Sequence, residues 1–361
     1  MAHITQWVPS RAAVLSLAPI QVQQFFTRNQ AVTELACIEQ AARVLGCQID
    51  GIRRTDVQGA DSFTLARVDG PTDTPAIVQF RDLSSPLDIS TINLACQTYR
   101  GVVPTCEKVD CAFDDQVHTY RMTLVAGIAF CAAQKKLYRD ASGQRLTQTV
   151  TDFASFVLLH LTLVWLQANQ KHYSFVVSSL LRTQQCTDSD MLNQAYGKLA
   201  VWEETLPQFR SKLAEIREQL PVIFGPEFPH VLNHADLWDM NIHVDEESGA
   251  ITGIIDWEGA EIGPFGGSLG SLEVFLGICS GNGQWMWHPQ ENRLRTVFYE
   301  TLGQNHQVRQ VNADAVEAAR AFSLFTTFGS RAGEDSEAAS SAAACLGAYL
   351  AERTAVQPFL R

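Results

Sequence analysis

Apolar positions divide the chain into a first part that mixes helices with strands and a second part that is mainly helical. Residues 20–26 and 31–45 carry apolar side chains at three- and four-residue spacing, which predicts two helices outside a small sheet. Short β-branched and aromatic runs predict the strands of that sheet, and helical spacing follows at 88–99. The predicted strands are 49–54, 62–68, 75–80 and 117–122.

The second part begins near residue 146, where the apolar spacing becomes that of long helices. Residues 149–167 are apolar around most of the helix circumference, as expected of a buried helix. A loop is predicted at 221–229. Further helices are predicted at 188–220, 313–325 and 337–352.

A short hairpin interrupts the helical part. Residues 242–244 and 251–255 predict two strands, and Glu246-Glu-Ser-Gly249 between them has turn chemistry. Asn241 precedes the first strand and Asp256 follows the second, so the hairpin brings both side chains to the same end. An amide oxygen and a carboxylate are hard ligands of the kind that Mg²⁺ prefers. We therefore predict a metal site made by Asn241 and Asp256.

The residues before the hairpin complete a catalytic pattern. His234, Asp236 and Asn241 are spaced as His-x-Asp-x-x-x-x-Asn. In the protein-kinase signature this Asp accepts the proton of the attacking hydroxyl, and the Asn and a later Asp hold Mg²⁺. Each residue alone is usually a turn or cap residue. The joint pattern of motif, strand, turn, strand and Asp256 is far more specific and indicates phosphoryl transfer.

The segments His234–Asn241 and Ile254–Glu258 resemble the aminoglycoside phosphotransferase and choline kinase family. Asp256-Trp-Glu replaces the Asp-Phe-Gly of protein kinases, as is typical of small-molecule kinases in that family. The resemblance implies an α+β, two-lobed protein-kinase-like fold with ATP and Mg²⁺ as cofactors and a small-molecule hydroxyl as substrate. It also implies a small antiparallel-sheet N-lobe, residues 1–123, and a larger, mainly helical C-lobe, residues 124–361. A weaker similarity to a fungal subgroup rests on the segments 58–64, 78–81 and 263–266.

The nucleotide-binding side departs from the family pattern. Gly59 is the only glycine where a glycine-rich loop belongs, so it either covers phosphates together with Ser62 or is an ordinary turn residue. Gln79 stands where a strand lysine is expected. Arg81 lies on the same strand face and can supply the missing charge.

The helix 88–99 contains no Glu to pair with that cation. Asp88 is the only nearby carboxylate in this segment, and the alternative is that it caps the helix. Met122 and Leu124 flank the lobe connection, where they either line the adenine slot or belong to the core.

The same resemblance assigns roles around the catalytic pattern. Asp236 would be the base, and His234 would brace the loop rather than react. Trp238 stands where many relatives have His or Lys, so contacts to the transferred phosphate would differ. Glu258 would reach a second metal through water or form a salt bridge. Two further aromatic residues would form a substrate box or belong to the core, namely Trp285 and Trp287.

Composition narrows the partners. The net charge of −12 argues against nucleic acid, because phosphate backbones need a basic surface. No run of 18 apolar residues and no signal-peptide pattern is evident, so we expect a cytoplasmic protein with no membrane partner. The sequence does not specify the acceptor, the oligomeric state, or ATP against GTP.

A rival hypothesis is a kinase-like fold that no longer transfers phosphate and acts as a binding protein or a biosynthetic enzyme with a repurposed cleft. The missing strand Lys and helix Glu favour it. The retained Asp236, Asn241 and Asp256 oppose it, because these residues have little reason to persist together otherwise.

Overall fold

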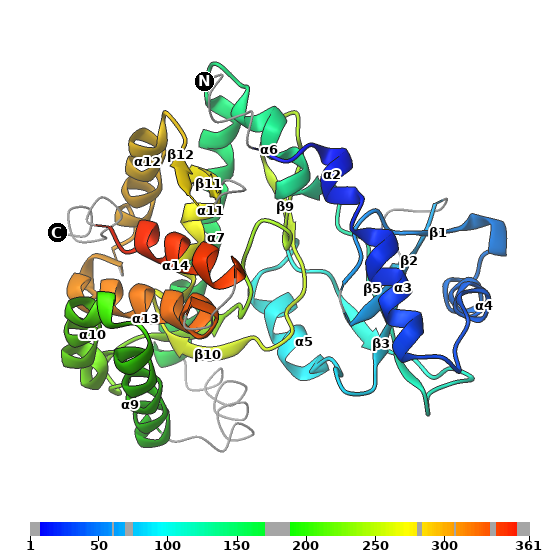
Figure 1. Cartoon of the computed structure of the whole chain (residues 1–361), viewed down its shortest axis with the longest axis horizontal. Coiled ribbons are helices and arrows are strands. Elements are labelled where there is room, and N and C mark those ends of the chain that lie inside the picture. Colours follow the sequence, from blue (N-terminus) through cyan, green and yellow to red (C-terminus); the bar gives the residue numbers. More distant parts are fainter. Residues whose placement is uncertain are drawn as a thin grey trace.

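The chain folds into a small lobe built on a sheet and a larger, mainly helical lobe (Figure 1). The computed structural model describes residues 8–59, 61–68, 75–169, 188–279, 284–306, 308–332 and 337–351. This arrangement confirms the predicted α+β, two-lobed fold. Among the helices of these residues, none is long and apolar enough to cross a membrane.

The small lobe contains an antiparallel five-stranded sheet in the order β1-β2-β3-β5-β4. Its strands are β1 (Ile52–Arg54), β2 (Ser62–Arg67), β3 (Pro75–Asp82), β4 (Cys106–Lys108) and β5 (Val117–Thr123). The short β4 was not predicted, because its three residues are too few for an alternating pattern. In the β2–β3 register Ser62 lies opposite Arg81 and Thr64 opposite Gln79. Directly opposed side chains share a face, so these four polar residues line one side of the sheet.

Two helices cover the sheet, α3 (Ala18–Arg28) and α4 (Glu34–Leu45), as predicted. Their apolar sides meet the sheet in a core that includes Phe25, Phe63 and Phe80, all fully buried. The short α2 (Arg11–Leu15) instead contacts α6 (Phe130–Tyr138), which follows the connection between the lobes. The first residues therefore do not all pack on the small lobe.

Helix α5 (Ile89–Thr98) begins at a side-chain cap. Oδ1 of Asp88 accepts hydrogen bonds from the backbone N–H of Ser90 at 2.9 Å and of Thr91 at 3.3 Å. These bonds satisfy amides that have no partner within the helix. Asp88 is thus the helix cap, and no ion pair joins it to Arg81 among the described residues.

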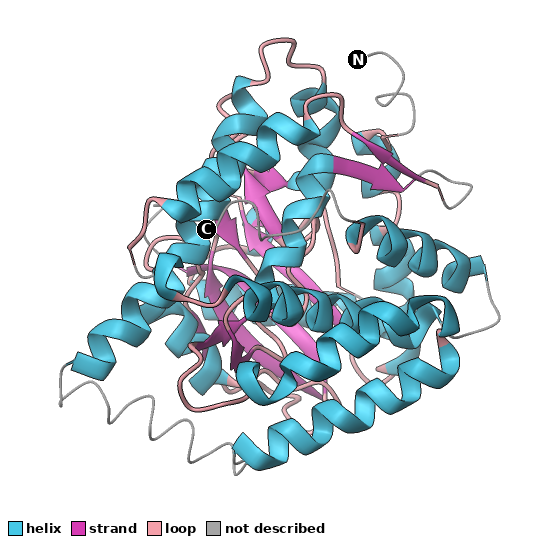
Figure 2. Cartoon of the chain, turned by 90° about the vertical axis from the view of Figure 1, so that its left-hand side faces the viewer, coloured by secondary structure: helices cyan, strands magenta, loops and turns pink. Residues whose placement is uncertain are grey.

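The large lobe combines its helices with three small antiparallel sheets (Figure 2). Its longer helices are α6, α7 (Gln144–Asn169), α9 (Asp188–Thr205), α10 (Arg210–Ile223), α12 (Glu291–Gly303), α13 (Ala313–Ala332) and α14 (Glu337–Tyr349), with the single turn α11 (Glu273–Leu276). The strands pair as β6 (Ile128–Ala129) with β8 (Ile242–Val244), β8 with β9 (Ile251–Ile254), β7 (His230–Asn233) with β10 (Glu261–Pro264), and β11 (Gly277–Cys279) with β12 (Trp285–Trp287).

The loop predicted at 221–229 begins later than expected. Helix α10 continues through Pro221 to Ile223. Pro221 forfeits one hydrogen bond of the helix because it has no N–H, and the burial of Leu220 and Ile223 favours continuing the turn despite that loss. Helices α6 and α12 were not predicted from the sequence.

The connection between the lobes lies on the β8–β9 hairpin. Oγ1 of Thr252 donates to the carbonyl oxygen of Ala126 at 2.6 Å. Gly127 has φ 77°, and a side chain there would collide with the carbonyl oxygen of Val244. Glycine is required at this position because it tolerates both the left-handed backbone and the close approach.

Candidate active site

The β8–β9 hairpin brings Asn241 and Asp256 to one end, as the sequence predicts. Ile242 lies opposite Ile254 in the ladder, and the N–H of Ile255 donates to the carbonyl oxygen of Asn241 at 2.9 Å. The residue before β8 and the residues after β9 are therefore neighbours. The two predicted metal ligands emerge at the same place, on the side of the large lobe that faces the sheet.

Asn241 also holds the preceding loop. Its Nδ2 donates to the carbonyl oxygen of Asp236 at 2.8 Å and lies 3.2 Å from the carboxylate Oδ2 of the same residue. The N–H of Trp238 bonds to the Asp236 carbonyl at 3.0 Å, which tightens the loop further. Since the amide nitrogen is used in this way, the amide oxygen Oδ1 is the atom that remains to ligate a cation.

His234 joins this loop to the segment after β9. Its Nδ1 accepts from the N–H of Asp236 at 3.0 Å, so Nε2 carries the proton and donates to the carbonyl oxygen of Ile255 at 2.9 Å. The ring is buried and meets Trp257 edge-on, with centroids 4.8 Å apart. Burial lowers the pKa of His234 to about 4. A neutral imidazole with both nitrogens bonded fits the predicted brace for the loop, and this role stays a prediction.

Asp256 has an unusual backbone. Its φ of 61° makes it the only non-glycine residue of the described chain in the left-handed region. Such a conformation costs on the order of 1–3 kcal/mol and is found mostly at functional sites. Enclosure in the cleft raises the pKa of its carboxyl, Arg81 opposes that rise, and the carboxylates of Glu258 and Asp236 add to it.

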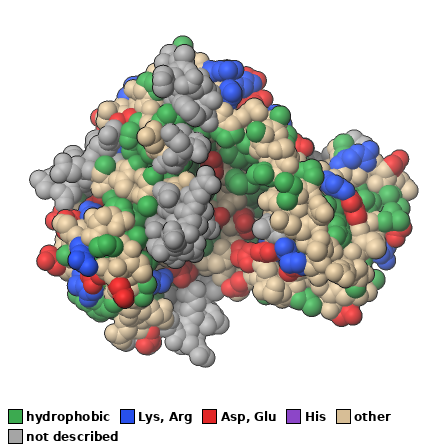
Figure 3. All heavy atoms as spheres, in the orientation of Figure 1, with side chains coloured by type: hydrophobic (Ala, Val, Ile, Leu, Met, Phe, Trp, Pro, Cys, Tyr) green, Lys and Arg blue, Asp and Glu red, His purple; other side chains and the backbone are tan. Residues whose placement is uncertain are grey.

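The donor set fits Mg²⁺. Asn241 and Asp256 supply two hard oxygen groups, and Mg²⁺ usually takes one or two protein groups together with phosphate oxygens and water. A cation between them would also relieve the mutual repulsion of Asp236, Asp256 and Glu258. Acidic side chains gather around the hollow between the two lobes (Figure 3). No group of three or more His, Cys, Asp or Glu side chains forms a metal cage within the described residues.

Arg81 reaches this acidic group from the small lobe. Its Nη2 forms an ion pair with Oε2 of Glu258, and its Nη1 lies 4.0 Å from Oδ1 of Asp256. Nε and Nη2 also donate to the carbonyl oxygen and hydroxyl of Ser85, both at 2.9 Å. The side chain is 6% exposed. The cation of β3 therefore lies beside the predicted metal ligand. Its carboxylate partner is Glu258, for which a salt bridge was one of two predicted roles, and Asp88 is the cap that the sequence offered as the alternative.

Gln79 supports Arg81 from the neighbouring position on β3. Oε1 of Gln79 accepts from Nη1 of Arg81 at 3.3 Å, and its Nε2 donates to Oγ1 of Thr64 at 3.2 Å. Gln79 is thus a hydrogen-bonding link between β2 and Arg81. Because its side chain is a neutral amide, Gln79 adds no charge to the cleft.

The β1–β2 connection contains Gly59 and Ser62, the predicted phosphate loop. Ser62 is buried at the start of β2, and its Oγ lies just beneath Gly59. Gln58, which the sequence analysis did not single out, holds the loop. Its amide bonds to the carbonyl oxygens of Thr55 and Thr64 and accepts from the N–H of Thr64 at 2.8 Å. The Gln58 side chain therefore joins the two ends of the loop.

Met122 and Leu124, at the connection between the lobes, differ in how far they are exposed to solvent. Met122 is half-buried on β5 and packs against the core of the large lobe, whereas Leu124 is exposed. Either can still meet an adenine ring, and their part in nucleotide binding stays a prediction.

Trp285 and Trp287, which the sequence assigns either to a substrate box or to the core, lie in an aromatic cluster with Trp238 and Tyr349. Trp238 lies against Phe328 at 5.0 Å and Tyr349 at 6.1 Å between ring centroids. Trp285 contacts Tyr349 at 4.8 Å and Trp287 at 5.6 Å. These tryptophans are partly buried and pack against the core of the large lobe, which favours the alternative to a substrate box. The cluster is two residues from Asp236 along the chain, so it borders the site.

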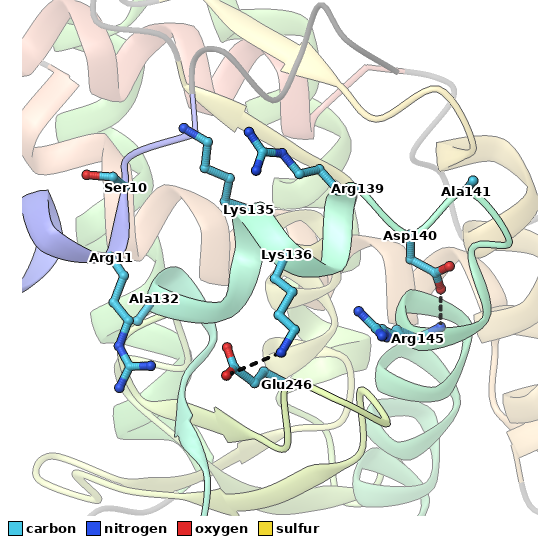
Figure 4. A pocket seen from close by; sticks show the side chains of 10 residues that line it. All are labelled: Ser10, Arg11, Ala132, Lys135, Lys136, Arg139, Asp140, Ala141, Arg145 and Glu246. Atoms are coloured by element: carbon cyan, nitrogen blue, oxygen red, sulfur yellow. Dashed lines mark hydrogen bonds and ion pairs between the residues drawn. The ribbon is translucent and has the colours of Figure 1, made fainter.

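A cavity of about 630 Å³ lies away from these residues, between α6 and the start of α2 (Figure 4). Lys135, Lys136, Arg139 and Arg145 line it, and Lys136 turns toward Glu246 of the β8–β9 turn at 3.4 Å. None of the catalytic, metal-binding or nucleotide-binding residues predicted from the sequence lines it.

Sequence analysis missed Ser85 and Asp239 as well as Gln58. No motif marks Ser85, which enters the site only because its hydroxyl bonds both Arg81 and Glu258. Asp239 stands within the catalytic pattern, and burial raises the pKa of its carboxyl to about 6, with Asp236 adding to the rise. Its position inside the motif was the one available signal.

A family model described as the phosphotransferase enzyme family matches residues 159–271. This span includes Asp236, Asn241, Asp256 and Glu258 but not Arg81 or the β1–β2 loop. Among curated proteins, none matches the chain.

Solved kinase structures share the fold. A candidate aminoglycoside phosphotransferase from Ralstonia eutropha JMP134 has a TM-score of 0.53 and 12% identity, and covers 83% of this chain and 92% of its own. Choline kinase from Cryptosporidium parvum Iowa II has a TM-score of 0.50 and 13% identity, with 87% and 92% covered. Plasmodium vivax ethanolamine kinase has a TM-score of 0.50 and 11% identity, with 84% and 83% covered. These findings confirm the resemblance to the aminoglycoside phosphotransferase and choline kinase family, and nothing among them tests the fungal subgroup.

Proposed function

We propose that this protein is an ATP- and Mg²⁺-dependent phosphotransferase that moves a phosphoryl group to a hydroxyl of a small molecule. The observation that carries the proposal is the meeting of Asp236, Asn241 and Asp256 at one end of the β8–β9 hairpin, facing a cation from the other lobe. The kinase-like fold and the family match over 159–271 support it.

Asp236 would orient the acceptor hydroxyl and take its proton. Its carboxylate is held by Nδ2 of Asn241, and its backbone N–H is bonded to His234, so both the side chain and the loop are oriented. A positioned base of this kind contributes about 10²- to 10⁴-fold to the rate. Catalysis would otherwise rest on positioning and charge neutralisation.

Asn241 and Asp256 would hold Mg²⁺, which when bound neutralises charge on the phosphates. Arg81 would contact the phosphates beside Asp256, because a guanidinium can bind phosphate oxygens with two parallel hydrogen bonds. Gly59 and the start of β2 would cover the phosphates, and Met122 or Leu124 would border the adenine.

The acceptor class stays open within small hydroxylated molecules. A secondary-metabolite alcohol, an amino alcohol and a sugar all fit a site whose base is a single carboxylate. Residues that select among them lie on the helices and loops of the large lobe, where fold alone gives no code.

Two measurements test the proposal. Thermal unfolding should show a higher melting temperature with ATP and Mg²⁺ together than with either one alone, because binding to the native state stabilises it. A screen of hydroxylated metabolites should then give one product heavier by a single phosphate. If Mg²⁺ makes no difference to ATP binding, the rival hypothesis of a kinase-like fold without phosphotransfer replaces this one.

A further inference from the structure

Kinases normally have a Glu on the helix after the third strand that forms an ion pair with the cation of that strand. This Glu is missing from α5, and Glu258 forms the ion pair with Arg81 instead. No Glu occurs between Ile89 and Thr98. Arg81 instead forms its ion pair with Glu258, which stands two residues after Asp256 on the other lobe. The partner of the cation has therefore moved from the small lobe to the large lobe.

The pair is part of a closed three-residue contact. Ser85 accepts from Nη2 of Arg81 at 2.9 Å and donates from the same hydroxyl to Oε1 of Glu258 at 2.8 Å. One carboxylate oxygen of Glu258 thus binds Arg81 directly and the other binds through Ser85. A hydroxyl can act as donor and acceptor at once, so all three groups are satisfied together.

The contact with Glu258 and Ser85 leaves Arg81 with one N–H group for a ligand. A guanidinium has five N–H groups. Ser85 and Glu258 take three of them through Nε and Nη2, and Gln79 takes one through Nη1. The remaining N–H belongs to Nη1, the nitrogen that lies 4.0 Å from Oδ1 of Asp256. The donor left for a ligand is the one beside the predicted metal position.

We propose that Glu258, assisted by Ser85, is a positioning residue that replaces the missing helix glutamate and aims Arg81 at the nucleotide phosphates. This inference rests on the proposed function. It assigns Glu258 to Arg81 and not to a second metal ion. Because the contact joins the two lobes, nucleotide binding by the small lobe depends on a carboxylate of the large lobe.

The test compares binding of Mg·ATP, Mg·ADP and adenosine by calorimetry in the full chain. Glu258→Gln keeps the shape of the side chain and removes its charge. Glu261→Gln is the matched control, since Glu261 is exposed a few residues further on. We expect Glu258→Gln to weaken Mg·ATP and Mg·ADP roughly 10-fold, as for loss of one charge-assisted contact. Adenosine affinity should not change, and Glu261→Gln should behave as the wild type.

A double-mutant cycle decides whether Glu258 works through Arg81. Arg81→Ala and Arg81→Ala/Glu258→Gln should have the same Mg·ATP affinity, because Glu258 has nothing left to position. Equal affinities of wild type and Glu258→Gln overturn the inference. So does an equal loss for adenosine, which would indicate a general structural defect, checked by circular dichroism.

The Mg²⁺ concentration needed for ATP binding distinguishes a positioning role of Glu258 from a role as a metal ligand. If Glu258→Gln raises the Mg²⁺ concentration needed for half-saturation and still weakens ATP in the Arg81→Ala background, Glu258 is a metal ligand and the inference is wrong. A wild-type protein that binds no Mg·ATP at all overturns the proposed function before any variant is compared. A positive wild type with an unaffected Glu258→Gln variant overturns only the positioning role.

Discussion

The Nε2 of His234 lies 2.9 Å from the carbonyl oxygen of Ile255, the residue that precedes Asp256. Through its other nitrogen the same ring accepts the N–H of Asp236. One neutral imidazole therefore fixes the predicted base relative to the predicted metal ligand. This link makes the geometry of the site depend on the protonation of a buried histidine.

His234 should make stability sensitive to acid. Its pKa is about 4 in the folded protein and 6.5 when unfolded. Above pH 6.5 both states are neutral and the group has no effect. As the pH falls toward 4 only the unfolded state gains the proton, so the free energy of unfolding drops by roughly 3 kcal/mol. Urea titrations from pH 7 to 4 should show a flatter pH dependence in His234→Asn, whose amide oxygen can still accept from Asp236. Parallel curves for the two proteins would contradict this assignment.

Asp236→Asn should lower turnover by about 10²- to 10⁴-fold and leave Mg·ATP affinity within a few-fold, because the base is lost while the metal ligands stay. Turnover is measured by phosphate transfer to the acceptor that the metabolite screen identifies. Asp115→Asn is the control, since Asp115 is exposed on the small lobe. Near-normal turnover in Asp236→Asn would remove this residue from the mechanism.

Asp256→Ala should abolish the Mg²⁺-dependent part of nucleotide binding, because the carboxylate that ligates the metal is gone. Calorimetry with Mg²⁺ and with a chelator measures that part. Asp256→Gly adds a second expectation: it should lose Mg²⁺ binding equally yet be more stable than Asp256→Ala, since glycine tolerates the φ of 61°. Equal Mg·ATP affinity in wild type and Asp256→Ala would show that the metal is held elsewhere.

Arg81→Ala should weaken Mg·ATP by roughly 1.5–3 kcal/mol, the range for a lost charge-assisted hydrogen bond. Gln79→Ala should cost less, about 1 kcal/mol, because Gln79 only supports Arg81 through a neutral group. Nucleotide titrations of both variants compare the two. Unchanged affinities with a lowered melting temperature would mean that Arg81 only joins the lobes, and would favour the non-kinase hypothesis.

A buried ionic network should stabilise the large lobe. Both carboxylate oxygens of Glu273 bind Arg295 at 2.8 Å, and both side chains are nearly inaccessible. Glu273→Gln should lower the free energy of unfolding by roughly 3–5 kcal/mol, because it removes the buried negative charge that faces both Arg295 and Arg320. Glu215→Gln breaks the exposed pair with Lys212 and should cost less than about 1 kcal/mol. Chemical denaturation of the two variants measures the difference, and similar losses would contradict the role of burial.

The sequence alone determined the parts of the site that lie close together along the chain. Asn241 and Asp256 meet because a short hairpin with its own turn signal joins them, and Asp236 enters through the same stretch. Strand alternation likewise placed Gln79 and Arg81 on one face of β3. Local spacing is enough for these relationships, because hairpin register and strand pleat follow from neighbouring residues.

Only the tertiary structure decided which carboxylate meets Arg81. Asp88 was the nearer candidate in sequence, but it caps α5, and Glu258 arrives from the other lobe together with Ser85. The same holds for Trp238 and Trp285, whose rings pack around Tyr349 from the end of α14. Contacts of this kind depend on how two lobes and distant helices are placed against each other, and the periodicity of a single segment carries no information about that placement.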